Sequence, residues 1–206
     1  MTVSISYIVF FDNLFATFVN HACGVFEILK LHVEKLHVKA DGNRGHPLNN
    51  FQMIMKNLKH CSDLQTQILK FVKDLESSYN IALLIIVGVN ILTVVLTGMT
   101  AIIKKTEPGE MLRMAFVSGG ALCHLFWISW LGHALEVQSE KVFISAYQGE
   151  WYDMPCQLQL MIIPIMIRSL RPCRLTAGKF YIMSMESFGN ALKMMISSFT
   201  VLNSMR

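Results

Sequence analysis

Two long stretches of the chain carry almost no charge, and each is long enough to cross a lipid bilayer as a helix. Residues 78–103 are uncharged between Glu76 and Lys104, and residues 113–136 are charged only at their two end positions. A helix needs about 20 apolar residues to cross the hydrocarbon core of a membrane. We therefore predict two membrane spans, over residues 78–103 and 113–136.

Two further stretches are apolar but interrupted by polar residues. Residues 3–28 contain Asp12, and a carboxylate inside a membrane is costly unless it faces protein or water. Residues 177–203 contain Glu186 and Lys193, which are seven positions apart and so lie near one face of a helix. We predict two more spans here, the last of them facing an ion pathway or a partner subunit. A surface amphipathic helix is the alternative for this last segment.

The segments between the spans also have helical patterns. Residues 31–77 form a predicted helical region that is broken by the Gly-, Asn- and Pro-containing stretch 41–50 and then continues into the second span. In residues 137–173, an apolar run around Pro164 is too short to cross a membrane, so we expect a buried helix. Apolar residues recur at helical spacing in the first of these regions: Leu58, Leu64, Ile68, Leu69, Val72 and Leu75.

The distribution of basic residues predicts the orientation in the membrane. Eight of the 18 Lys and Arg residues lie between positions 30 and 73. Basic residues concentrate in cytoplasmic loops, so residues 31–77 and 137–173 are expected in the cytoplasm. Four crossings follow, with both ends of this chain outside.

Composition agrees with a membrane protein. Hydrophobic residues make up 53% of the 206 residues and charged residues only 16%, whereas soluble domains carry about 25% charged residues. The sequence therefore predicts an all-α, multi-pass membrane helix bundle. The net charge is +4, and the charges are clustered. The basic region 31–77 could attract anionic lipid, but its interspersed acidic residues and leucines favour protein packing. We expect no nucleic-acid partner.

The reactive residues do not form a recognisable catalytic or metal-binding set. The five cysteines are isolated and odd in number, which argues against a disulfide framework, and the histidines lack ligand spacing. The intramembrane candidates Asp12, His21, His124 and Glu186 share no catalytic motif. We expect no metal, no cofactor and no enzyme activity. A membrane-embedded enzyme or a non-receptor membrane scaffold remains the alternative reading.

Small and aromatic residues in the third predicted span suggest how it packs. Gly119 and Gly120 are small enough to let another helix approach closely, whereas helical spacing puts Leu125 on the opposite, lipid-facing side. Trp127 and Trp130 are expected at the inner membrane interface.

Three stretches of the sequence resemble one known family. They are VFISAYQGEWYDMP (142–155), RSLRPCRLTAGKFYIMSMESFGNALKMMISSFTVL (168–202) and FDNLFATFVNHACGVFEILK (11–30). In order and spacing, the first two are similar to the C-terminal end of insect odorant receptors, and the third resembles the fourth span of that family. Family members have seven spans and about twice this length, so the chain resembles spans four to seven.

The resemblance implies a function and a set of partners. It implies a multi-pass receptor subunit of the plasma membrane with a cytoplasmic N-terminus of the whole receptor. Such a subunit forms an odorant-gated cation channel, expected to be tetrameric, with a shared co-receptor. Its ligands are small volatile molecules, and membrane lipid surrounds it.

The resemblance also implies a gate and an odorant pocket. By distance from the C-terminus, Val201 falls where the family has an apolar gate, and Ser204 falls near a polar constriction; plain helix packing is the alternative for Val201. Odorant contacts are expected from apolar, aromatic and a few polar side chains in the outer halves of the spans. These candidates are Tyr7, Phe10, Phe11, Asn90, Thr93, Thr97, Phe116, Ser118 and Leu122.

Overall fold

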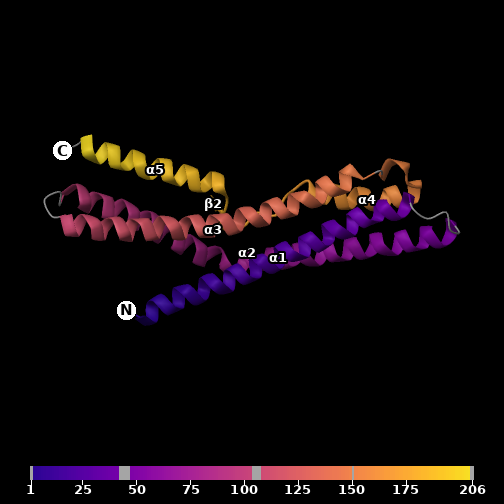
Figure 1. Ribbon diagram of the computed structural model, residues 1–206, viewed down its shortest axis with the longest axis horizontal. Coiled ribbons are helices and arrows are strands. Elements are labelled where there is room, and N and C mark those ends of the chain that lie inside the picture. Colours follow the sequence, from indigo (N-terminus) through magenta and orange to yellow (C-terminus); the bar gives the residue numbers. More distant parts are fainter. Residues whose placement is uncertain (1, 42–46, 104–107, 150, 205–206) are drawn as a thin grey trace. The chain divides into compact units, whose positions relative to one another are not determined.

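The computed structural model describes residues 2–41, 47–103, 108–149 and 151–204, and these are mostly helical. Their helical content confirms the predicted all-α class. Proline is the first residue of two long helices, where its fixed φ fits and its missing N–H costs nothing. The elements are α1 (Thr2–Asp41), α2 (Pro47–Ile103), α3 (Pro108–Gln148), the 3-10 helix η1 (Trp151–Asp153), α4 (Cys156–Ser169), β1 (Thr176–Ala177), β2 (Tyr181–Ile182) and α5 (Met185–Ser204) (Figure 1).

The chain divides into two compact units, each made of two segments of sequence. Unit 1 comprises Met1–Leu75 and Ala134–Arg174, and unit 2 comprises Glu76–His133 and Leu175–Arg206. The long helices α2 and α3 each contribute to both units. The predicted region 31–77 does continue into the second span, because α2 is one uninterrupted helix.

Unit 1 is held together by helices whose buried residues follow a spacing of three and four positions. That spacing keeps one stripe of each helix facing its neighbours. On α2, Leu64 and Leu69 are only half-buried, whereas the other four apolar positions predicted from the sequence are buried. The buried stripes are Phe15, Val19, Ala22, Phe26, Leu29 and Val33 on α1, and Leu58, Cys61, Gln65, Ile68, Val72 and Leu75 on α2.

The short apolar helix predicted around Pro164 is α4, and it is packed inside unit 1. It has 14 residues and buries Leu158, Ile162 and Ile165. Gln65 of α2 is 7% exposed, and its Nε2 donates to the carbonyl O of Ile165 at 3.2 Å and to Ser169 Oγ at 2.8 Å. A buried amide costs free energy unless it is hydrogen-bonded, so this pair of bonds fixes α4 against α2.

In unit 2, α2 has a buried stripe on one side and large exposed aliphatic side chains on another. Leu83, Val87, Asn90 and Val94 are buried, at spacings of four, three and four. Ile81 is 70% exposed and Ile85 is 60% exposed. Exposure of aliphatic side chains to water costs about 1.5–3 kcal/mol each, a cost that lipid removes. Val89, Leu92 and Leu96 extend the same exposed face.

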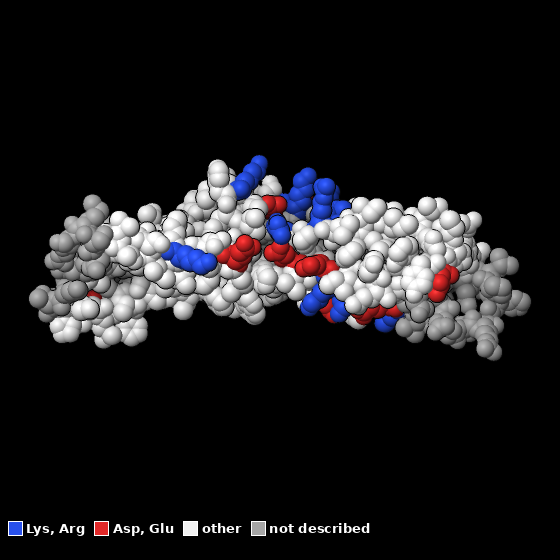
Figure 2. Space-filling model, turned by 90° about the horizontal axis from the view of Figure 1, so that it is seen from above, with Lys and Arg blue, Asp and Glu red and all other residues white. Residues whose placement is uncertain are grey.

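Three helical stretches of the described residues are long and apolar enough to cross a membrane: Ile8–Lys35, Phe51–Ala101 and Pro108–Gln148. They overlap the predicted spans 3–28 and 78–103 and contain the predicted span 113–136. Figure 2 shows that charged side chains cover little of the face drawn and gather in clusters. The fourth crossing, by the last helix, stays a prediction.

The predicted start of the last helix is wrong. We expected helix from residue 177, but α5 begins at Met185 and a hairpin of β1 and β2 precedes it. Gly178 and Lys179 both have a φ of 62°, and the N–H of Phe180 donates to the carbonyl O of Ala177 at 3.2 Å. Two successive residues at positive φ make a tight hairpin turn, which no helix can contain.

The glycines predicted to allow close packing of α3 make no such contact within the described chain, and the predicted lipid-facing position of Leu125 is wrong. A Cβ added at Gly119 or Gly120 would meet nothing within 4 Å, so neither glycine marks a close approach in the described chain. Leu125, expected to face lipid, is 1% exposed. The close approaches in unit 2 lie instead at Gly132, which contacts Met183, and at Gly98, which contacts Phe199.

Cysteine labelling tests the predicted orientation. Cys61 is a poor reporter because it is buried, whereas Cys156 at the start of α4 is exposed and lies in a region predicted to be cytoplasmic. We expect a membrane-impermeant maleimide to leave Cys156 unlabelled on intact cells and to label it after permeabilisation. Labelling of Cys156 on intact cells would refute the four-crossing topology.

Candidate functional site

A polar pair lies between two helices that are long and apolar enough to cross a membrane, within unit 2. Asn90 of α2 is 8% exposed, and its Nδ2 donates to the carbonyl O of Ile86 at 2.8 Å and lies 3.1 Å from His124 Nδ1 of α3. The amide Nδ2 is a donor, so His124 Nδ1 is the acceptor in this contact. The partnership of His124 with Asn90 was not predicted from the sequence.

The other predicted odorant contacts of unit 2 are less closely grouped. Thr93 and Thr97 lie three and seven positions after Asn90, so they share its side of α2. Their hydroxyls donate to α2 carbonyls, Thr93 to Val89 and Thr97 to Thr93, each at 2.7 Å.

On α3, the predicted contacts differ in exposure. Ser118 Oγ donates to the carbonyl O of Ala115 at 3.1 Å. Leu122 and Ser118 are half-buried, whereas Phe116 is 74% exposed.

The predicted contacts on α1 belong to unit 1. Phe10 is 67% exposed and Phe11 is half-buried, while the side chain of Tyr7 lies outside the described part of the chain. The structure therefore places three candidates in one unit and six in the other, and a pocket that combines them stays a prediction.

The last helix, α5, has a stripe of exposed polar side chains. These residues recur at spacings of four and three, which puts them on one side of the helix. Ala191 and Met195 on another side are buried, and Phe199 contacts Gly98 of α2. Val201 is 56% exposed beside the stripe, and the side chain of Ser204 lies outside the described residues. The polar stripe consists of Glu186, Asn190, Lys193, Ser197 and Thr200.

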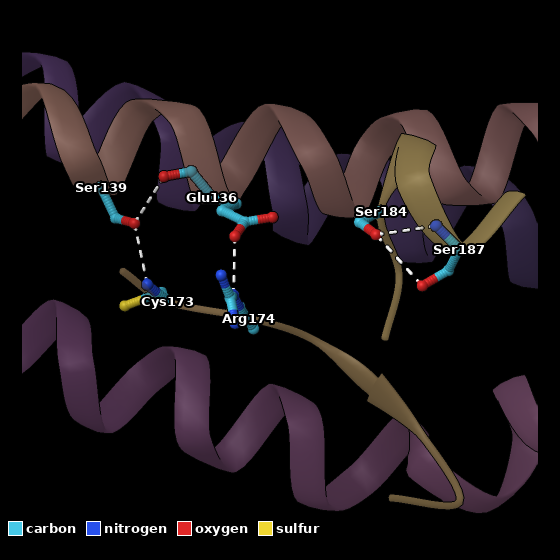
Figure 3. Close-up of polar contacts among 6 residues, drawn as sticks. All are labelled: Glu136, Ser139, Cys173, Arg174, Ser184 and Ser187. Atoms are coloured by element: carbon cyan, nitrogen blue, oxygen red, sulfur yellow. Dashed lines mark hydrogen bonds and ion pairs between the residues drawn. The ribbon is translucent and has the colours of Figure 1, made fainter. Parts of the chain in front are cut away.

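The connection between α4 and the hairpin is hydrogen-bonded to α3 within unit 1. Arg174 Nε donates to Glu136 Oε1 at 2.6 Å, and the N–H of Cys173 donates to Ser139 Oγ at 2.8 Å (Figure 3). Ser139 Oγ in turn donates to the carbonyl O of Glu136 at 2.8 Å. The side chain of Glu136 is 15% exposed, so this charge-assisted bond is partly shielded from water.

The hairpin is hydrogen-bonded to α2 and to α3 of unit 2. The N–H of Gly178 donates to the carbonyl O of Asn80 at 3.2 Å, and Tyr181 OH lies 3.3 Å from Ser129 Oγ. Burial raises the pKa of Tyr181, although its hydrogen bond to Ser129 opposes the shift. These contacts set the place from which α5 begins.

Ser184 caps α5, and Figure 3 shows the contact. The N–H of Ser187 donates to Ser184 Oγ at 3.2 Å, and Ser184 Oγ donates to Ser187 Oγ at 3.1 Å. A serine in this position satisfies one of the free N–H groups at a helix start. The cap explains why the helix begins at Met185, immediately after the hairpin.

The described residues offer no metal site, since none of their His, Cys, Asp and Glu side chains form a group of three or more that could hold an ion. Asn90 and His124 form a polar link between α2 and α3 within unit 2. An amide paired with an imidazole between apolar helices suits hydrogen bonding to a small polar group.

Known proteins match this chain over nearly its whole length. Odorant receptor 13a of Drosophila melanogaster is 23% identical over 94% of this chain and 48% of its own length. Odorant receptor Or2 of Anopheles gambiae is 26% identical over 93% of this chain and 50% of its own length. The chain therefore spans about half the length of these curated relatives.

A solved structure has the same fold. The olfactory receptor OR5 of Machilis hrabei, solved in complex with eugenol, matches 95% of this chain and 48% of its own chain with a TM-score of 0.78 and 15% sequence identity. The family model for the 7tm Odorant receptor matches residues 1–196. The predicted partial odorant receptor fold is thereby confirmed, and the chain belongs to the 7tm odorant receptor family.

Proposed function

We propose that this chain is the C-terminal part of a plasma-membrane odorant receptor subunit, which forms an odorant-gated cation channel with a co-receptor subunit. The observation that carries the proposal is the polar stripe of α5. In a helix that crosses a membrane, charged and hydroxyl side chains are tolerated where they face water or protein. The stripe gives α5 one such side, and this side lines the ion pathway.

The ligand class follows from the polar pair and its surroundings. OR5 of Machilis hrabei was solved with eugenol, a small molecule. In this chain, Asn90 and His124 offer hydrogen-bonding groups among apolar helices. We propose that a small volatile ligand with one polar group binds in the outer part of the spans, and that it opens the channel by binding the open state more tightly.

The experiment that tests the proposal uses a hybrid receptor. It joins the N-terminal half of Odorant receptor 13a to residues 1–206 of this chain, and it is expressed with a co-receptor in cells that lack other odorant receptors. We expect odorant-evoked cation currents from the hybrid with the co-receptor. Normal surface expression without current for any member of a broad odorant panel would contradict the proposed function.

A substitution at the predicted gate tests the pore-lining assignment. A ring of apolar side chains closes a pore by dewetting, so Val201→Ser should raise the current without odorant. Ile196→Ser is the matched control, because Ile196 lies on the same helix and is also 56% exposed. Equal basal currents in the two variants and the parent hybrid, at equal surface expression, would remove Val201 from the gate.

A second substitution tests the polar pair as a ligand anchor. Asn90→Leu should weaken the response to hydrogen-bonding odorants about fivefold, since one hydrogen bond contributes about 1 kcal/mol. Responses to hydrocarbon odorants should change by no more than about twofold, because a hydrocarbon makes no hydrogen bond to Asn90. Thr100→Val is the control, since Thr100 is on the same helix, is not a predicted odorant contact, and donates its hydroxyl to the carbonyl O of Leu96. An equal loss for both odorant classes would assign Asn90 to packing instead.

A further inference from the structure

The tip of the hairpin presents an aromatic ring and a basic side chain away from the protein. We define the hairpin tip as Gly178, Lys179 and Phe180. Phe180 is 91% exposed and Lys179 is exposed. Lys179 also has a φ of 62°, a conformation that favours glycine. A large exposed aromatic next to a lysine is a combination typical of groups that enter the boundary between lipid headgroups and acyl chains.

The hairpin tip is fixed at a definite level of unit 2. Gly178 bonds to the carbonyl O of Asn80, and a Cβ added at Gly178 would lie 2.6 Å from Leu84. The adjacent Tyr181 bonds to Ser129 of α3. The hairpin therefore cannot slide along α2 or α3 without loss of these contacts.

This level lies near one end of the uncharged runs of α2 and α3. Asn80 lies two residues inside the uncharged run 78–103, and Ser129 lies seven residues before Glu136. At 1.5 Å per residue these positions are about 3–10 Å from the ends of the runs. The headgroup region extends about 5–7 Å beyond the hydrocarbon core. The hairpin tip therefore lies near one end of the uncharged run of α2, which is the part of a span closest to the headgroups.

Neighbouring side chains of unit 2 support the same depth. On α2, Ile81 and Ile85 are largely exposed on either side of the Leu84 contact. On α3, Trp127 and Trp130 flank Ser129, are 45% and 47% exposed, and have ring centroids 5.9 Å apart. Tryptophan concentrates at the membrane interface because its ring is apolar and its N–H is polar.

We propose that the hairpin tip is a lipid-binding anchor, in which Phe180 enters the acyl-chain boundary and Lys179 binds the phosphate and carboxylate of anionic headgroups. The choice of leaflet rests on the proposed function, whose topology puts this edge on the cytoplasmic side, where anionic lipids concentrate. The anchor would hold the start of α5 at a constant depth, since only Met183 and Ser184 separate Ile182 from Met185.

Quenching by nitroxide lipids tests the anchor. The full chain is placed in nanodiscs of phosphatidylcholine and phosphatidylserine, with a fluorescent amino acid at position 180 or, as the control, at position 152. Tyr152 is 61% exposed in η1, in a region predicted to be cytoplasmic. A nitroxide on acyl carbon 5 should lower fluorescence about twofold at position 180, because an anchored ring reaches the acyl boundary. The signal at position 152 should not change.

The role of Lys179 is tested with the nitroxide on phosphatidylserine or on phosphatidylcholine. Lys179→Gln should lower the preference for phosphatidylserine about fivefold, the effect expected of one basic residue near an anionic surface. Photoactivatable phosphatidylserine tests the unaltered chain, and its adducts should map to residues 176–184. A preference unchanged by Lys179→Gln would remove this lysine from the anchor.

Three results would overturn the anchor: no quenching at position 180, no lipid adduct in residues 176–184, or a photo-crosslink from position 180 to a second polypeptide. The last result would make the hairpin tip a subunit contact. A hybrid receptor that conducts but shows no quenching would refute the anchor alone. Quenching without any odorant-evoked current would refute the proposed function alone.

Discussion

Gly132→Ala is expected to destabilise unit 2 by about 3 kcal/mol, the upper end of the cost of overpacking. A Cβ added at Gly132 would overlap the carbonyl O and the Cβ of Met183. A backbone carbonyl cannot rotate away as a flexible side chain can, so the segment that leads into α5 must move. The apparent melting temperature of the purified chain, followed by size-exclusion chromatography after heating, measures the effect.

Gly119→Ala is the matched control, because it makes the same change in the same helix. A Cβ at Gly119 meets nothing within 4 Å. Replacement of glycine by alanine inside a helix otherwise stabilises it by up to about 1 kcal/mol. The two substitutions should therefore change the melting temperature in opposite directions. Equal shifts would show that Met183 does not lie against Gly132 in the membrane.

The glycines also show that the sequence does not indicate which distant residue packs against a given glycine. Gly119 and Gly120 are adjacent in the sequence and suggest a packing surface, whereas Gly98 and Gly132 are isolated and give no such signal. Whether a glycine allows a close approach depends on which residue of another segment packs against it. Here the partners are Phe199 and Met183, which follow about 100 and 50 residues later along the chain.

The helices themselves could be predicted, because their signals are local. Uncharged runs and three-four spacing of apolar residues predicted the spans and the continuous α2. The structure confirms the continuous α2 and contains three helices long and apolar enough to cross a membrane. The boundary between hairpin and α5 could not be recognised in the same way, since residues 177–184 are mostly apolar or small. Its signals were Gly178 in the turn and Ser184 at the cap.

The candidate site was predicted less completely than the fold. Glu186 and Lys193 indicated a polar side of the last helix, and the structure extends that side to Asn190, Ser197 and Thr200. Asn90 was proposed as a ligand contact without its partner, because His124 is 34 residues away in the sequence. Pairing between two helices depends on their rotation about their own axes, which the sequence of either helix alone does not determine.

The second large effect is expected in unit 1, where Gln65→Ala should cost about 3 kcal/mol, the upper end of the cost of leaving a buried polar group without a partner. The side chain of Gln65 is the donor to both the Ile165 carbonyl and Ser169 Oγ. Ser169 is itself 7% exposed, so water cannot readily replace the lost bond. Loss of the amide should loosen α4, and α4 should then become more sensitive to limited proteolysis.

Gln67→Ala is the control, because Gln67 lies two positions along α2 and is exposed. An exposed substitution of this kind usually changes stability by no more than about 0.5 kcal/mol. Ser169→Ala completes a double-mutant cycle: if the two side chains act as a pair, the double variant should be more stable than the sum of the single losses predicts. Equal melting temperatures for Gln65→Ala and Gln67→Ala would show that α4 is held by its apolar contacts, Leu158, Ile162 and Ile165, without help from the buried amide.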